Sequence, residues 1–396
     1  MKIVTLSTYP IENPRHGGQH RLLNLVRSLQ ASGHSVSAVG VMGAPHYPPS
    51  AGFLPRPPTT EFNHYIPNPL LMDDWALGEL MALDDRYFPR LAALIPPDTE
   101  VLHIEQPWLF RFARRYVAER RTRPPLLIYG GQNVEHELKL RIVTNYLGEE
   151  HAKACAELVL ECETDALRHA DLVCAVSQED AVWMQARTKT DVVLAANGAN
   201  DRSASLDGIR LANKITGHRR FALYSASAHP PNVVGFFDMF GRGVGCFAPN
   251  QSLVVAGSAG SAIQGNDRFP KTPGLDRHFI ASGEVDDDCL SALLQVAHAI
   301  VLPITQGGGT NLKTAEAIWA GHHIVATPLA MRGYEQFIGS LGVSVHSEPA
   351  EFRLAVREAM GQPALALTPD ERERRRVVLW ESTLMPLIKR VNELAD

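Results

Sequence analysis

The sequence predicts an α/β protein with two doubly wound, Rossmann-like domains, each built on a parallel sheet. The chain of 396 residues is too long for one ordinary core, so two domains of about 150–200 residues are expected. It opens with a strand, a glycine loop, a helix and a second strand, which is how a doubly wound sheet begins. The same alternation restarts after a turn-rich stretch at Asn197–Gly217, which has the composition of a linker.

The first elements follow from hydrophobic periodicity. Lys2–Ser7 is a mostly apolar run that predicts a buried strand. The loop after it ends in Gly17 and Gly18. A helix is then expected at Gln19–Ser32, because leucine and valine recur there at helical spacing. Gly33 ends this helix, and the next strand follows directly.

The remaining elements continue the alternation. Strands are expected at Val101–Glu105, Leu126–Tyr129, Leu172–Val176, Asp191–Ala195, Phe221–Ala226, Leu253–Ala256, His278–Ala281, Ala299–Leu302 and His323–Ala326. Helices are expected at Trp108–Arg121, Glu149–His169 and Trp380–Leu394. These elements predict an N-terminal domain at residues 1–200 and a C-terminal domain at 201–378. Residues 379–396 form a last helix that could pack back on the first domain.

Composition excludes several classes of protein. A net charge of −5 argues against nucleic acid as the main partner, because phosphate backbones require clustered positive charge. The five cysteines are scattered without metal-ligand spacing, which is typical of reduced thiols. Neither a signal peptide nor a run of 18 apolar residues is found. A cytoplasmic protein is expected.

The stretch VLPITQGGGTNLKTAEAIWAG at residues 301–321 is the most informative motif. An apolar strand ends at a proline, three glycines and a threonine follow, and a helix begins. Glycines let backbone N–H groups approach an anion, and the helix N-terminus carries partial positive charge. Lys313 adds a full charge, and Glu316 can accept hydrogen bonds from hydroxyls. This combination favours a sugar nucleotide, whereas the alternative is a tight packing turn beside a solvated lysine.

Short segments in a fixed order along the chain carry a family resemblance. They are the Gly17-Gly18 loop, YGGQNVEHE (129–137), HADLVCAVSQED (169–180), LAANGAN (194–200), SASAHPPNVVGF (225–236), VVAGSAG (254–260), SGEVDD (282–287) and GGGTNLKTAEAIWAG with HHIVATPLAMRGYE (307–335). Together they resemble the retaining GT-B glycosyltransferases of family 4 over nearly the whole chain.

The resemblance implies a GT-B fold, with two Rossmann-like domains facing a cleft. It also implies a nucleotide-sugar donor held mainly by the C-terminal domain and an acceptor held mainly by the N-terminal domain. The expected reaction moves a sugar, from a UDP-sugar rather than a GDP-sugar, to a hydroxyl of a glycan, lipid-linked or small-molecule acceptor. The anomeric configuration is retained, without cofactor or metal. The alternatives are a sugar-nucleotide epimerase on the same fold and a degenerate protein that binds a sugar nucleotide or glycan without catalysis.

The chain departs from the family pattern at three places. The first glutamate of the family signature would fall on Gly308, so that only Glu316 remains. A second basic residue is common after the first strand of the donor domain, but SASAHPPN holds only His229, which could substitute for it. Gln132 stands where a histidine is often found.

Donor-side roles are assigned by motif position and chemistry. The residues expected at the donor diphosphate are Gly17, Gly18, Gly307, Gly308, Gly309, Thr310, Asn311 and Lys313. Lys313 and Glu316 are the expected catalytic residues, with Glu316 on the ribose hydroxyls unless it merely pairs with Lys313 on the helix surface. Glu284 and Val285 are expected to present backbone to the base, and Arg332 and Gly333 to line the sugar. Gly17 and Gly18 could instead form only a flexible loop tip.

Acceptor-side candidates follow strands or loops of the first domain. They are His16, Glu105, Gln132, Asn133 and His136. These polar residues could equally cap helices, and a lone loop histidine such as His16 is more often solvated.

The segment Trp108–Arg123 combines six arginines with aromatic residues. A basic amphipathic helix of this kind can contact an anionic membrane surface, which would place the protein peripherally at the inner face. The favoured alternative is an outer helix with a solvated face. The acidic runs Asp73-Asp74 and Asp286–Asp288 do not adjoin the glycine-rich motif, so no metal site is predicted.

Overall fold

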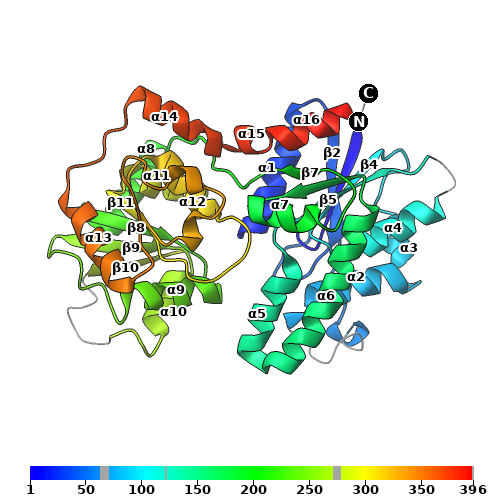
Figure 1. The fold of residues 1–396 in the computed structure, drawn as a ribbon, viewed down its shortest axis with the longest axis horizontal. Helices are drawn as coiled ribbons and strands as arrows, with labels where there is room; N and C mark the ends of the chain where they lie inside the picture. Colours follow the sequence, from blue (N-terminus) through cyan, green and yellow to red (C-terminus); the bar gives the residue numbers. More distant parts are fainter. Residues whose placement is uncertain (63–70, 121–122, 271–277, 395–396) are drawn as a thin grey trace. The chain divides into compact units, whose positions relative to one another are not determined.

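The computed structural model describes residues 1–62, 71–120, 123–270 and 278–394, and it divides into two compact units (Figure 1). The first unit is Met1–Ala196 together with Leu384–Asp396, and the second is Asn197–Thr383. Each unit contains one sheet in which every paired strand is parallel to its neighbour, so the predicted α/β fold with two doubly wound domains is confirmed.

The first unit has a seven-stranded sheet in the order β3-β2-β1-β4-β5-β6-β7. The strands are β1 (Lys2–Ser7), β2 (Ser35–Val41), β3 (Phe53–Leu54), β4 (Val101–Glu105), β5 (Leu126–Gly130), β6 (Leu172–Ala175) and β7 (Val192–Leu194). The order reverses between β1 and β4, so the carboxyl ends of these two strands flank the switch point where ligands of such sheets bind.

Helices connect these strands. They are α1 (Gly17–Ala31), α2 (Asp73–Leu83), α3 (Phe88–Ala92), α4 (Phe110–Glu119), α5 (Glu135–Leu147), α6 (Glu149–His169), α7 (Gln178–Gln185) and, from the end of the chain, α16 (Met385–Glu393). Helices α5 and α6 pack along each other as a hairpin (Figure 1).

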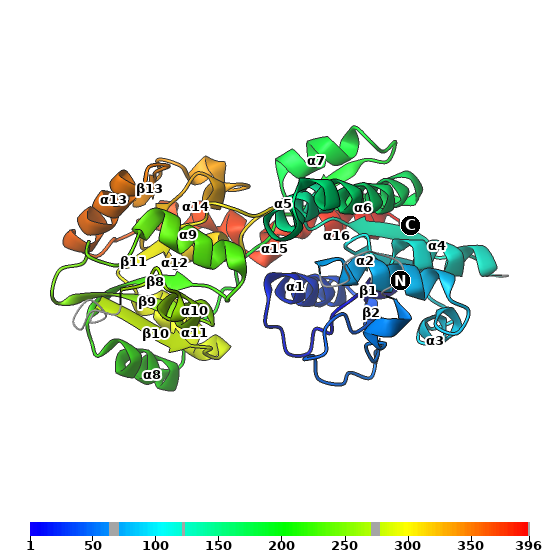
Figure 2. The same cartoon turned by 90° about the horizontal axis from the view of Figure 1, so that it is seen from below.

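The second unit has a six-stranded sheet in the order β10-β9-β8-β11-β12-β13. Its strands are β8 (Arg220–Ser225), β9 (Gln251–Ala256), β10 (Phe279–Gly283), β11 (Ala299–Leu302), β12 (His323–Ala326) and β13 (Val343–Val345). Its helices are α8 (Leu206–Thr216), α9 (Pro230–Phe240), α10 (Ala259–Gly265), α11 (Asp287–Val296), α12 (Leu312–Ala320), α13 (Pro349–Gly361), α14 (Pro369–Arg375) and α15 (Trp380–Thr383). Figure 2 shows α9 and α13 on one side of this sheet and α8 and α11 on the other. The switch point lies between β8 and β11.

Two element predictions need correction. The expected linker at Asn197–Gly217 contains helix α8, because the Ser205 side chain accepts a hydrogen bond from the Gly208 amide and starts a helix there. The expected last helix is two helices, α15 and α16, and Pro386 stands in the first turn of the second one.

Central strands of both sheets are completely buried. Every residue of β9 is buried, and so is every residue of β4 and β11. Runs buried on both faces are expected of parallel strands that helices cover on both sides. Within the described residues, no helix is long and apolar enough to cross a membrane.

Candidate functional site

The glycine-rich turn of the second unit leads from the end of β11 into α12. Gly307 has φ of 132° and Gly309 has φ of 57°, backbone conformations that favour glycine. The Gly309 carbonyl accepts a hydrogen bond from Arg332 Nε at 2.7 Å, and the Thr310 carbonyl accepts one from Asn197 Nδ2 at 2.9 Å. Both carbonyls are therefore fixed by side chains.

The amide N–H groups of the same turn have no protein acceptor. From Gly307 to Asn311 none of them donates to any residue in the described ranges. Gly309 and Thr310 are nevertheless buried, and buried backbone N–H groups in proteins are nearly always paired. The turn thus offers a row of free donors next to the N-terminus of α12, an arrangement suited to an anion.

Lys313 lies where the carboxyl ends of β8 and β11 adjoin. Its Nζ donates to Asn232 Oδ1 at 2.7 Å and lies 5.3 Å from the centroid of the Tyr224 ring. Asn232 belongs to the first turn of α9, and its carbonyl accepts a hydrogen bond from the Tyr224 hydroxyl at 3.0 Å. Burial lowers the pKa of Lys313 to about 8. The ammonium is therefore held by one neutral partner rather than by a carboxylate.

His229 occupies the N-cap position of α9 at the same edge of the sheet, and its side chain makes no capping hydrogen bond. Burial and then the charge of Lys313 lower its pKa, so at neutral pH it is an uncharged imidazole and not a second cation. Burial also raises the pKa of Glu316 to about 7, although the charge of Lys313 opposes this shift. Glu316 makes neither an ion pair with Lys313 nor a hydrogen bond to any other described residue, so the alternative in which the two merely pair is not observed.

The other donor-side candidates differ in whether their polar groups already form hydrogen bonds within the protein. Asn311 is the N-cap of α12, and its side chain makes no capping bond. Arg332 is bonded to the glycine turn, and the Gly333 amide donates to Glu335. Glu284 is exposed after β10, whereas Val285 packs against the core of the unit.

In the first unit, Gly17 and Gly18 form the first turn of α1, and their amides donate to no described residue. A Cβ atom on Gly18 would lie 3.0 Å from Gln132 Oε1 and 3.1 Å from the Tyr9 hydroxyl. Gln132 donates to that hydroxyl at 2.7 Å. The glycine therefore allows the start of α1 to lie directly on the Tyr9–Gln132 pair.

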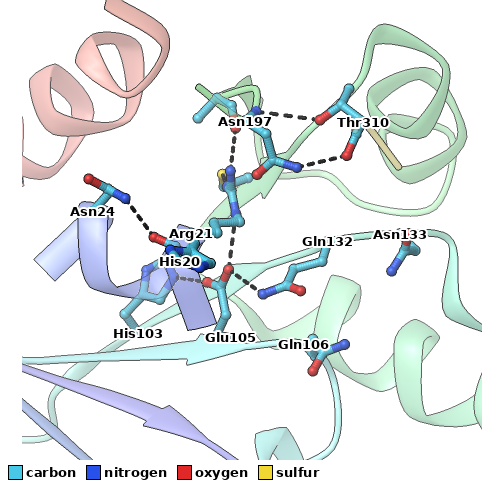
Figure 3. A network of polar contacts seen from close by, with 12 residues as sticks. His20, Arg21, Asn24, His103, Glu105, Gln106, Gln132, Asn133, Asn197 and Thr310 are labelled. Atoms are coloured by element: carbon cyan, nitrogen blue, oxygen red, sulfur yellow. Dashed lines mark hydrogen bonds and ion pairs between the residues drawn. The ribbon is translucent and has the colours of Figure 1, made fainter. Parts of the chain in front are cut away.

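A buried polar network lies beneath that turn, at the β1–β4 switch point (Figure 3). Glu105 accepts hydrogen bonds from Arg21 Nε at 3.0 Å, Gln132 Nε2 at 3.0 Å and His103 Nε2 at 2.7 Å. Arg21 also donates to the Ala195 carbonyl at 2.9 Å. Burial alone would raise the pKa of Glu105, but the His103 hydrogen bond and the Arg21 charge outweigh it and lower the pKa to about 2.

No pattern in the sequence indicates that these residues contact one another. Glu105 was expected to face an acceptor, but the structure uses both of its carboxylate oxygens inside the unit. The ion pair joins residues 84 positions apart, and neither Arg21 nor His103 stands in a recognisable motif. Only the adjacency of β1 and β4 could have indicated the pair.

A second polar cluster surrounds Glu135, at the start of α5. Asn133 Nδ2 and Gln106 Nε2 donate to its carboxylate at 3.0 and 3.1 Å, and burial raises its pKa to about 7. His136 Nδ1 lies 2.8 Å from a carboxylate oxygen of Glu163, which also accepts from the Glu135 and His136 amides. Asn133 and His136 are thus tied to the start of α5.

His16 precedes α1. Its Nε2 lies 3.0 Å from the Tyr47 hydroxyl, and its ring meets that of Tyr9 edge-on. Burial, followed by the nearby His20, lowers the pKa of His16 to about 4, so the ring is neutral at physiological pH.

The basic segment Trp108–Arg123 contains α4, and residues 121–122 lie outside the described ranges. Four of its arginines have partners within the unit: Arg111 with Glu79, Arg114 with Asp165, Arg115 with Asp85 and Glu119, and Arg120 with the Tyr116 hydroxyl. Three of these four positive charges are balanced by carboxylates. This pairing does not favour contact with an anionic membrane.

Aspartates of the two acidic runs form an ion pair or a helix cap within their own units. Asp73 pairs with Arg56, and Asp286 caps α11 by accepting from the Cys289 amide at 2.8 Å. No group of three or more histidine, cysteine or acidic residues in the described part of the chain is arranged to hold a metal ion.

Comparisons with known proteins agree with this architecture. No family model and no curated protein sequence matches the chain. Among solved structures, sucrose-phosphate synthase from Thermosynechococcus elongatus superposes with a TM-score of 0.68 at 16% identity, covering 100% of this chain and 99% of that one. HepE from Anabaena, in complex with UDP-glucose, gives a TM-score of 0.58 at 14% identity and covers 100% of both chains. The lipopolysaccharide glycosyltransferase WaaG gives 0.58 at 13% identity, covering 97% of this chain and 94% of that one.

These likenesses define the fold. The chain has the GT-B fold of two Rossmann-like domains, which it shares with nucleotide-sugar glycosyltransferases. Sequence identity at this level establishes the architecture and not the family.

Proposed function

We propose that the protein is a retaining glycosyltransferase that moves a sugar from a nucleotide-sugar donor to a hydroxyl acceptor. The observation that carries the proposal is the glycine-rich turn at residues 307–311, whose amide N–H groups donate to no described residue. Lys313 follows in the first turn of α12. A row of free N–H groups, a helix N-terminus and an ammonium together form a diphosphate site. The neighbouring carboxylate of Glu316, which makes no hydrogen bond or ion pair with any described residue, is assigned to the ribose hydroxyls.

The chemistry follows from where charge develops. Transfer breaks the bond between the anomeric carbon and the β-phosphate oxygen, and the bonding electrons leave with the diphosphate. The turn amides and Lys313 stabilise that negative charge in the transition state. In a front-face mechanism the departing phosphate oxygen takes the proton of the acceptor hydroxyl, while the acceptor oxygen bonds to the same face of the anomeric carbon. This reaction requires no nucleophilic side chain.

UDP-sugars are the proposed donors. Two of the similar solved structures support this choice: HepE is in complex with UDP-glucose, and a trehalose-6-phosphate enzyme from E. coli is bound with UDP-2-fluoro glucose. The acceptor is assigned to the first unit, where Gln132, Asn133 and His136 follow β5.

One observation favours a second candidate, a protein that binds a sugar nucleotide without catalysis. Gly308 stands where the family signature has a glutamate, and His229, in the place of a second basic residue, is neutral at physiological pH. Lys313 is then the one cation assigned to the diphosphate, and both departures weaken sugar recognition and leaving-group stabilisation more than they weaken nucleotide binding.

The test is a thermal-shift screen of the full chain against UDP-, GDP- and ADP-sugars, followed by an assay of nucleotide release with a panel of hydroxyl acceptors. Ligand binding to the folded state raises Tm. We expect a UDP-sugar to raise Tm and an acceptor to stimulate UDP release. Binding without release across the panel would favour the non-catalytic candidate. The absence of any Tm shift with all three nucleotide classes would contradict both.

A further inference from the structure

We propose that Asn197 is a positioning residue for the phosphate turn, acting together with Tyr334. This inference rests on the proposed function, because it concerns how the same turn is made competent to bind a diphosphate. Asn197 was expected at the start of a linker and within the resemblance segment LAANGAN, without a role of its own, and it is the first residue of the second unit after the chain leaves the first.

Asn197 is bonded to the turn and to the segment after β12, all within the second unit. Its Nδ2 donates to the Thr310 carbonyl at 2.9 Å, and its backbone N–H donates to Thr310 Oγ1 at 3.4 Å (Figure 3). The Asn197 carbonyl in turn accepts from the Tyr334 hydroxyl at 2.8 Å. Asn197 and Tyr334 are both buried, so these bonds are shielded from competing water.

Fixing a carbonyl also fixes an amide. In a trans peptide the C=O and the following N–H lie in one plane and point in opposite directions. The bond from Asn197 to the Thr310 carbonyl therefore aims the N–H of Asn311. The bond from Arg332 to the Gly309 carbonyl aims the N–H of Thr310 in the same way. Neither amide donates to an acceptor in the part of the chain that the structure describes.

Glycine makes this restraint necessary. Gly307 and Gly309 give the turn conformations that other residues rarely adopt, but glycine also leaves the backbone free to rotate. Without the side-chain bonds, the Thr310–Asn311 peptide could turn its carbonyl toward the ligand and present an acceptor to a phosphate oxygen. Asn197 thus selects the peptide orientation that offers donors.

The experiment compares the affinities of UDP and uridine, measured by calorimetry, in the full chain. Asn197→Asp keeps the shape of the side chain but replaces the Nδ2 donor with a carboxylate oxygen, so Tyr334→Phe, which adds no charge, is measured beside it. Asn200→Asp is the matched control, because Asn200 lies three residues on and its side chain makes no hydrogen bond in the described structure. We expect Asn197→Asp to weaken UDP binding roughly 10-fold, the effect of losing about one hydrogen bond, and to leave uridine binding unchanged. Asn200→Asp should change neither.

Equal weakening of UDP and uridine, or no weakening of either, would overturn the positioning role. If Asn197→Asp does not fold, Tyr334→Phe makes the same comparison, with the same pattern expected at roughly 3-fold. A wild-type protein that binds UDP no more tightly than uridine would instead contradict the phosphate site itself, which separates failure of the proposed function from failure of this inference.

Discussion

Lys313 is the residue on which the proposed chemistry depends most. Its ammonium faces the amide oxygen of Asn232 and the ring of Tyr224, and it forms no ion pair with a carboxylate of the described residues, although the charge of Glu316 acts on it from a greater distance. Lys313→Ala should lower turnover at least about 100-fold, the effect of losing one transition-state donor. Steady-state kinetics with the donor that the screen selects measure this change.

A matched control for Lys313→Ala is Lys214→Ala, which removes an exposed lysine from the last turn of α8 in the same unit. It should leave turnover within 2-fold of wild type, because a solvated charge away from the turn contributes little. Wild-type turnover in Lys313→Ala would remove the residue from the mechanism.

The pKa values of Lys313 and Glu316 predict how activity depends on pH. Lys313, with a pKa of about 8, is charged below that pH and loses its charge as the pH rises through it. Glu316, with a pKa of about 7, becomes a carboxylate as the pH rises through 7. If both charged forms are required, kcat/KM rises near pH 7 and falls near pH 8, a narrow bell that reports the free enzyme.

Glu316→Gln separates the two limbs of that profile. The amide accepts hydrogen bonds but does not titrate, so the acid limb near pH 7 should disappear. The alkaline limb should remain but move to lower pH, because the charge of Glu316 raises the pKa of Lys313. Donor affinity should fall as well, because a neutral oxygen is the weaker acceptor. A pH profile of Glu316→Gln identical to that of wild type would assign the acid limb to another group.

At the scale of elements, the Arg21–Glu105 ion pair joins α1 to β4 across the switch point of the first sheet. Glu105→Gln leaves the buried guanidinium without its countercharge, which costs about 3–5 kcal/mol. Hydrogen exchange of peptides from β4 and α1 should show this loss at neutral pH. Glu137→Gln, an exposed glutamate on α5, should change nothing measurable.

The stability that Glu105 contributes should decrease as the pH falls. The pKa of Glu105 is about 2 in the folded state, below the ordinary glutamate value of about 4.3. Its stabilisation is therefore fully present above about pH 4.3 and is lost as the pH falls toward 2. The difference between wild type and Glu105→Gln should shrink over that range. A difference that is independent of pH from 7 to 3 would contradict the assignment.

Sequence patterns predicted elements well where a strand is buried and has a neighbouring strand on each side. The bounds of β1, β4, β11 and β12 agree with the expected segments, because strands buried on both faces are continuous apolar runs. The edge strand β13 was not predicted. The two residues of β3 lie in a proline-rich stretch where only loops and short strands were expected. Helix α8 was missed because its first residues, Ser205 to Gly208, have the composition of a turn although they form a helix cap.

The candidate site was only partly predictable. Lys313, Glu316 and the glycines form one continuous motif, so their neighbourhood follows from the sequence. Asn232 and Asn197 contact that motif from positions 81 and 113 residues away, across connections whose paths only the folded structure defines. Both asparagines lie in segments that carry the family resemblance, but asparagine is ordinary in turns, so the sequence assigned neither side chain to the phosphate turn.

At the scale of the whole molecule, the chain passes from the first unit to the second at Ala196–Asn197 and returns at Thr383–Leu384. The return segment ends in α16, which contacts β7 and His34, the residue before β2. Asn392 Oδ1 lies 2.7 Å from His34 Nε2, and Arg390 lies 3.7 Å from Asp191. The first unit is therefore completed by residues that come after the second unit in the sequence.

This arrangement predicts that a core substitution near the end of the chain destabilises the beginning of it. Leu387 is 0% exposed and Met385, two residues earlier, is 58% exposed. Leu387→Ala removes buried methyl groups and should cost the first unit about 2–5 kcal/mol, whereas Met385→Ala should cost under about 0.5 kcal/mol. Hydrogen exchange resolved by peptide is the measurement, because a single unfolding midpoint does not distinguish two units. Exchange should accelerate in β7 and α1 and stay unchanged in β11 and α12; acceleration in the second unit alone would show that α16 supports the other domain.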